Sequence, residues 1–143
     1  MDHRAGLSPA QRVYAEAFYP VFEGAKVVFL RVAASMILWT QGCESTEGHV
    51  DSLRLSLDEM RRIQATWATF VSAYEQRYGL DDRAVTGEIA VVTSTVAALR
   101  YAVDGGDKER AHALMARLAT CHGALRRRAL ALWPLELRAE TCV

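Results

Sequence analysis

The side chains best suited to chemistry are concentrated in residues 118–133, LATCHGALRRRALALW, which hold a cysteine, a histidine and three consecutive arginines. A thiol beside arginines would have its thiolate favoured electrostatically, and the thiolate is the reactive form of cysteine. A histidine within hydrogen-bond reach could serve as its base. At about 100° per helical residue, however, Cys121 and His122 lie about 100° apart, on opposite flanks of a leucine seam. We therefore expect no nucleophile–base pair, and we expect Cys121 to be a small core residue.

His122 has a second reading, because it belongs to the stretch CHGALR. This stretch resembles the end of the haem-attachment motif of the cytochrome c′ family, which lies on the last helix of a four-helix bundle. The first cysteine of that motif is replaced here by Leu118. The resemblance implies a haem, which would be held non-covalently with His122 and Met36 as axial ligands. The alternative is a histidine at the boundary of the core that forms a local hydrogen bond.

His112 lies in the stretch AHALMARLA, which is similar to the AHxLKG motif of histidine-phosphotransfer domains, themselves helical bundles. The helical period points His112 about 140° away from the leucine seam, so it should be exposed as a phosphoacceptor must be. Met115 stands where that family has lysine, and Ala116 stands where it has glycine. The lysine brings positive charge to the incoming phosphoryl group, and here that charge is missing. The alternative is an exposed histidine on a polar face.

A basic surface is expected on the last helix, formed by Arg117, Arg126, Arg127 and Arg128, with no acidic residue between the first and the last of them. The segment from Glu44 to Glu59, in contrast, holds five acids and one arginine. Such a patch would suit an acidic protein surface or the acidic segment of a second copy. The alternative is a solvated basic face, which the helix dipole favours in a C-terminal half.

Composition narrows the range of partners and compartments. Seventeen basic and seventeen acidic residues give a net charge of zero, so the chain lacks the long-range field of a nucleic-acid or membrane-surface binder. Residues 25–39 are apolar but contain Lys26 and Arg31 and are too short to cross a bilayer. Three widely spaced cysteines suggest free thiols, and no secretory signal is recognisable, so we expect a cytoplasmic protein.

Apolar residues recur at three- and four-residue steps in four segments, and this period predicts an all-α protein. Ser8 and Pro9 are typical of a helix start, whereas Pro20 should kink the first helix or split it. Ser56 and Glu59 have the spacing of a capping box, so residues 42–55 are expected to form the longest connection. The helix could also begin earlier, near Ser52, because Leu53 lies four residues before Leu57. The expected helices are roughly 9–41, 53–78, 82–103 and 108–133, followed by a tail at 134–143. Together they predict a single domain, 1–143, folded as an antiparallel four-helix bundle.

The helix over 21–41 is apolar around most of its circumference, which a monomeric bundle does not require. This excess indicates a homodimer interface through that helix, or a fifth short helix that lies across the bundle. Because no catalytic motif is recognisable, the sequence favours a non-enzymatic protein that acts by protein–protein interaction, as an adaptor, a regulator or a small chaperone. The alternatives are a sensor that binds haem or another flat ligand near His122, and a degenerate phosphotransfer domain that uses His112.

Overall fold

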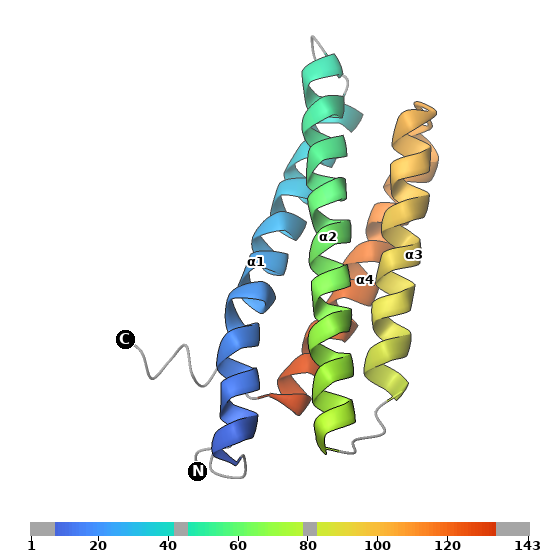
Figure 1. The fold of residues 1–143 in the computed structure, drawn as a ribbon. Coiled ribbons are helices and arrows are strands. Elements are labelled where there is room, and N and C mark those ends of the chain that lie inside the picture. Colours follow the sequence, from blue (N-terminus) through green and yellow to red (C-terminus); the bar gives the residue numbers. More distant parts are fainter. Residues whose placement is uncertain (1–7, 42–45, 79–82, 134–143) are drawn as a thin grey trace.

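The computed structural model describes residues 8–41, 46–78 and 83–133. They form four helices, α1 (Pro9–Thr40), α2 (Thr46–Tyr78), α3 (Arg83–Asp104) and α4 (Lys108–Leu132), and no strand occurs among these residues. Successive helices run antiparallel (Figure 1). The prediction of an all-α, antiparallel four-helix bundle is therefore confirmed. The predicted tail at 134–143, together with Cys43 and Cys142, lies outside the described residues.

The bundle consists of two helical hairpins. α1 packs most extensively against α2, and α3 packs most extensively against α4. The two hairpins meet along a well-packed α2–α3 seam and along an α1–α4 seam with far fewer contacts. α2 and α3 stand side by side with α4 behind them (Figure 1). Because the α1–α4 seam has few contacts, each side chain that joins these two helices makes up a large share of the seam.

The first helix begins as its sequence predicts. The Ser8 hydroxyl accepts a hydrogen bond from the Gln11 backbone N–H at 3.2 Å, and the Gln11 side chain accepts one from the Ser8 N–H at 2.8 Å. Pro9 occupies the first turn, where its missing N–H costs nothing. Pro20 lies inside α1, and the helix is continuous on both sides of it, so it is not split there. The kink at Pro20 stays a prediction.

The second helix corrects the sequence reading, because it begins at Thr46 rather than near residue 53. The capping-box interpretation is wrong, since Ser56 is buried in the interior of the helix. The physical reason lies in Val50, Leu53 and Leu57, whose spacing carries the apolar stripe two turns further back than the capping signal suggested. Packing of this stripe outweighs the low helix propensity of Gly48.

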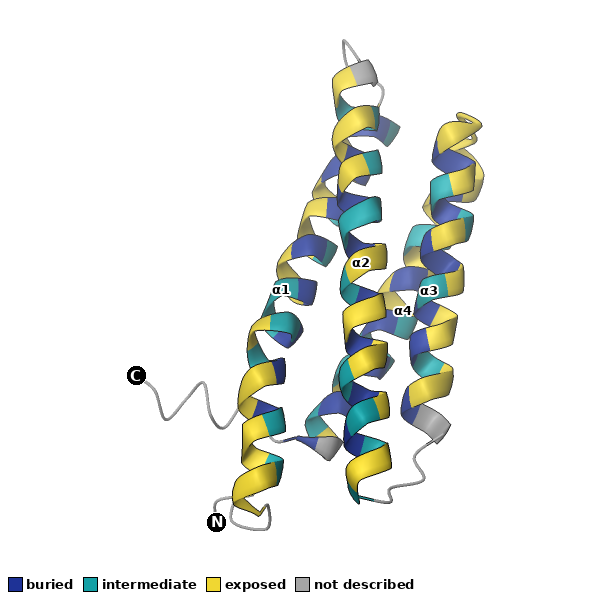
Figure 2. Ribbon diagram, in the orientation of Figure 1, coloured by how far each residue is buried: buried dark blue, intermediate teal, exposed yellow. Residues whose placement is uncertain are grey.

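Buried residues line the inward face of every helix (Figure 2). Aromatic rings fill the end of the core where α1 begins and where α2 and α4 end. The Trp133 ring lies 4.6 Å from the ring of Phe18 and 4.9 Å from that of Tyr74, measured between centroids. Trp39, Trp67 and Trp133 are all buried, as their positions on apolar stripes predict.

Candidate functional site

His122 lies inside the core, facing α1. Its side chain is only 2% exposed, and its ring is stacked on that of Phe29 with the centroids 4.8 Å apart and the planes within 4° of parallel. The sequence placed this residue at the boundary of the core, about 60° from the leucine seam. That placement is wrong because Phe29 of α1 covers this flank of α4.

Arg126 is one turn further along α4 and also reaches α1. Its guanidinium donates to the Phe22 carbonyl at 3.1 Å, and its central carbon lies 4.0 Å from the centroid of the Phe22 ring. This is a cation–π contact, strengthened by a charge-assisted hydrogen bond to the backbone. Two stacked pairs, His122 on Phe29 and Arg126 on Phe22, therefore join α4 to α1.

The surroundings of His122 keep its imidazole neutral. Burial, and secondly the positive charge of Arg126, lower its pKa from the ordinary 6.5 to about 4. Its Nε2 atom is buried and has no hydrogen-bond partner among the described residues. The neutral imidazole of His122, packed on the Phe29 ring, behaves as an aromatic core residue. Its Nε2 atom remains a buried polar atom without a partner among the described residues.

Met36, the second residue of the predicted haem pair, lies elsewhere on the α1–α4 seam. It is buried and lines a groove of about 340 Å³ between α1 and α4, together with His112 and Met115. Seven residues separate it from Phe29, which corresponds to about 10 Å along α1. The structure therefore brings Met36 together with His112 and Met115, whereas the α1 residue opposite His122 is Phe29.

Cys121 is half-buried and faces α3. Its Sγ atom lies 3.9 Å from the Thr95 hydroxyl and 3.6 Å from the Leu118 carbonyl. Its thiol is free. Arg128 of the same helix forms an ion pair with Glu88 at 3.3 Å. Cys121 thus contacts neutral groups of α3 and α4, in keeping with the expected core residue.

The predicted basic surface is divided in the structure. Arg117 and Arg127 are exposed on α4. Arg126 is half-buried against α1, and Arg128 is exposed but compensated by Glu88 of α3. Two of the four guanidiniums are thus used to join α4 to its neighbours, which leaves Arg117 and Arg127 as the cations that could meet an acidic partner.

Sequence reasoning missed Gln64, which is completely buried on α2. Both polar atoms of its amide lack a hydrogen-bond partner among the described residues. Its position was detectable, because Met60, Gln64, Trp67 and Val71 follow the four- and three-residue steps of a buried stripe. Gln64 lies one turn from Trp67, which packs on Phe22, the ring that Arg126 also contacts.

No protein-family model matches this chain, and comparisons with curated proteins and with solved structures find no match. Among the described residues, no helix is long and apolar enough to span a bilayer. Over the same residues, no group of three or more histidines, cysteines and carboxylates is arranged to hold a metal ion. Function must therefore be argued from the surfaces and seams of the bundle itself.

Proposed function

We propose that this chain is a non-enzymatic protein that acts through protein–protein association, and that its first partner is a second copy of itself. The observation that carries the proposal is the outer α1 face, formed by Val27, Leu30, Ala34, Ile37 and Leu38. The four larger side chains of this face are each between 48% and 55% exposed. Isolated apolar side chains are common on surfaces, but a group of them on one helix face is typical of an interaction site.

These side chains form one stripe on the helix. At about 100° per residue, each of the four lies within about 60° of Ala34. The buried face of α1, which includes Val32 and Met36, points the opposite way. Positions 27, 30, 34 and 37 also follow the alternating three- and four-residue steps of a coiled-coil seam, which is completed by a second helix.

The stripe is self-complementary about Ala34. Leu30 lies four residues before Ala34, and Leu38 lies four residues after it. A two-fold axis through Ala34 would set two α1 helices antiparallel, so that Leu30 of each copy meets Leu38 of the other. The small side chain of Ala34 at the axis lets the two backbones approach closely. This symmetry favours a second copy over an unrelated partner.

Charge at the edges of the outer α1 face is compatible with this pairing. Arg31, at one edge, is paired with Glu59 of α2 at 3.4 Å, so its charge is compensated within the same chain. The residue related to Arg31 by the same two-fold axis is Ile37, over which the aliphatic stem of an arginine can pack. The pairing would therefore cover the Arg31 edge of this face with the charge of Arg31 already compensated by Glu59.

The test is the mass of the chain in solution, measured by light scattering coupled to size exclusion at tens of micromolar. We expect twice the 15.9 kDa of one chain for the wild type and a single-chain mass for Leu30→Glu/Leu38→Glu. The matched control is Leu55→Glu, because Leu55 is 70% exposed on α2 and lies outside the outer α1 face. Helical circular dichroism of each variant checks that it is folded.

A wild type that stays monomeric at 100 μM would overturn the proposal, and so would a dimer that survives the double substitution. If the wild type is monomeric but a different protein binds it and loses affinity with Leu30→Glu/Leu38→Glu, the outer α1 face serves a heterologous partner instead.

The two alternative functions have weaker support in the geometry. A haem or another flat ligand at His122 would have to displace the Phe29 ring that stacks on this imidazole. Phosphotransfer by His112 has an exposed imidazole, but Met115 beside it brings no positive charge. The nearest lysine before His112 on α4 is Lys108, one turn away. Its ammonium lies over the Trp39 ring, 5.8 Å from the ring centroid, and so contacts α1.

A further inference from the structure

The groove between α1 and α4 gathers three side chains with soft or borderline donor atoms. Met36 comes from the last turns of α1, and it is buried at the wall of the groove. His112 and Met115 come from α4, three residues apart and therefore on the same face of that helix. The groove thus presents two thioethers and one imidazole, supplied by two helices.

The other walls of the groove leave these three groups as its main donors. Ala33 and Ile37 are apolar, and the Thr40 hydroxyl is engaged because it donates to the Met36 carbonyl at 2.7 Å. Gln41 completes the described lining, and no carboxylate is among the residues of this lining that the structure describes. Hard cations such as Mg²⁺ and Ca²⁺ require several oxygen ligands, so this lining does not suit them.

Thioether sulfur is a soft ligand that selects Cu(I) among biological metal ions, and imidazole also coordinates copper. We propose that this groove binds one Cu(I) ion through the Sδ atoms of Met36 and Met115 and an imidazole nitrogen of His112. His112 is exposed, so the metal can enter from solvent. The last turn of α1 ends beside the groove, and its carbonyl end carries the partial negative charge that favours a cation.

To bind one metal ion, the two Sδ atoms and the imidazole nitrogen must point toward the same place. Methionine is suited to this because its side chain is flexible. Its side chain has three rotatable bonds and packs adaptably, so the thioethers of Met36 and Met115 can change rotamer to approach one ion. Ile37 belongs both to the groove and to the outer α1 face, but the double substitution tested above replaces only Leu30 and Leu38, and neither of these lines the groove. Loss of dimerisation and loss of metal binding are therefore separable results.

The test uses the full chain with Cys43→Ser, Cys121→Ala and Cys142→Ser, because cysteine thiolates bind Cu(I) strongly and would mask a thioether site. Under anaerobic conditions Cu(I) is added, with Ag(I) as a redox-inert analogue in a parallel titration. We expect the ε-methyl NMR signals of Met36 and Met115 to shift and to saturate at one equivalent. The signal of Met60, which is fully buried on α2, serves as the internal control and should stay in place.

Affinity is measured by competition with a chromophoric Cu(I) chelator. Met115→Leu and His112→Gln should each weaken binding at least tenfold, whereas the matched variant Met60→Leu should not change it. Methionine-to-leucine changes conserve volume, and His112 is exposed, so these variants should fold. The proposal is overturned if one equivalent shifts none of these methyl signals, if Met60 shifts equally, or if Met115→Leu binds as tightly as its parent.

Discussion

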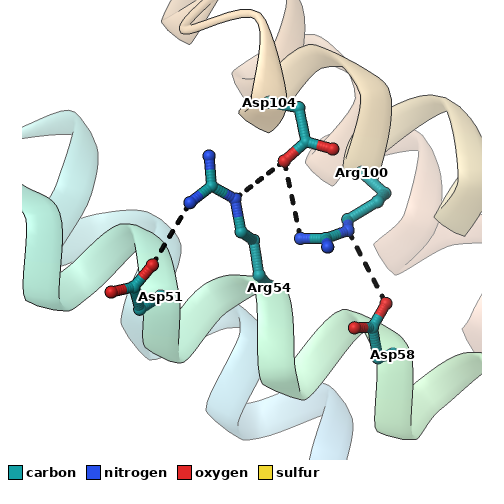
Figure 3. Close-up of polar contacts among 5 residues, drawn as sticks. All are labelled: Asp51, Arg54, Asp58, Arg100 and Asp104. Carbon is teal, nitrogen blue, oxygen red and sulfur yellow. Dashed lines mark hydrogen bonds and ion pairs between the residues drawn. The ribbon is translucent and has the colours of Figure 1, made fainter.

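The two seams that join the hairpins differ in the kind of interaction that holds them. On the α2–α3 seam, Asp104 accepts from Arg54 at 2.7 Å and pairs with Arg100 at 3.5 Å, while Arg100 also pairs with Asp58 at 3.6 Å (Figure 3). Asp51 pairs with Arg54 within α2 at 3.2 Å. The hydrogen bond from Arg54 to Asp104 raises the pKa of Arg54. This ladder of compensated charges lies at the surface, over a conventional apolar core.

The α1–α4 seam places its polar groups on aromatic rings. His122 is buried against Phe29, and Arg126 is half-buried against Phe22. The groove beside Met36 and Met115 interrupts the packing at the other end of this seam. We therefore expect the α2–α3 seam to respond to salt, because exposed ion pairs are screened. The α1–α4 seam should respond to pH and to the loss of single side chains, because a buried imidazole must stay neutral.

Of the changes considered, acidification should lower the free energy of unfolding most, through His122. The unfolded chain takes up a proton near pH 6.5, whereas the folded chain keeps this imidazole neutral down to about pH 4. The unfolded state therefore binds more protons in this window, and stability falls as the pH is lowered from 6.5 to 4. The full difference corresponds to about 3 kcal/mol in the free energy of unfolding. Urea unfolding at pH 7.5, 6, 5 and 4 measures it.

Carboxylates also titrate at the acid end of this range, so the effect of His122 must be isolated by difference. In His122→Leu the pH dependence should become flatter between 6.5 and 4, and stability at pH 7.5 should stay near that of the wild type, because the unpartnered Nε2 is removed together with its ring. His112→Gln, which replaces an exposed histidine of the same helix, should keep the wild-type dependence. Equal flattening in both variants would refute the assignment to His122.

Arg126 should give the second-largest effect. Arg126→Ala removes the cation–π contact and the hydrogen bond to the Phe22 carbonyl, with an expected loss of about 2 kcal/mol. The neighbouring Arg127 is exposed, so Arg127→Ala should change stability by no more than about 0.5 kcal/mol. Since Arg126 helps to lower the pKa of His122, its removal should raise that pKa toward 6.5 and so reduce the stability that is lost between pH 6.5 and 4. Equal losses for the two alanine variants would show that the seam does not depend on Arg126.

The four-helix bundle could be predicted from the sequence, because the apolar period that indicates a helix lies within a single segment of the chain. The helix start at Ser8 and the buried tryptophans follow from spacing within single segments, and the structure has the expected cap at Ser8. Asp107 caps α4 in the same local way, because its side chain accepts from the Arg110 N–H. The start of α2 was misplaced because Gly48 and the acidic residues around it resemble a connection, whereas Val50 and Leu53 pack as part of the helix.

The features of the α1–α4 seam could not be predicted in the same way. The sequence groups Arg126 with Arg127 and Arg128 in one basic surface, but the long side chain of Arg126 reaches a carbonyl 104 positions away in the sequence. Similarly, His122 is buried only because Phe29 of another helix covers it. Such contacts depend on which helices are neighbours and at what register they pack, and the period of one helix contains neither piece of information.

The smallest effect is expected at the α2–α3 ladder. Exposed ion pairs are each worth about 0.2–1 kcal/mol, so Asp104→Asn should lower the melting temperature by a few degrees at most. The loss should shrink in 1 M NaCl, where the Debye length is about 3 Å, whereas the loss in Arg126→Ala should persist. Asp51→Asn is the matched control, because Asp51 pairs only within α2 among the recorded contacts and should matter less than Asp104. If salt leaves the Asp104 effect unchanged, the ladder acts by packing rather than by charge, and the contrast between the two seams fails.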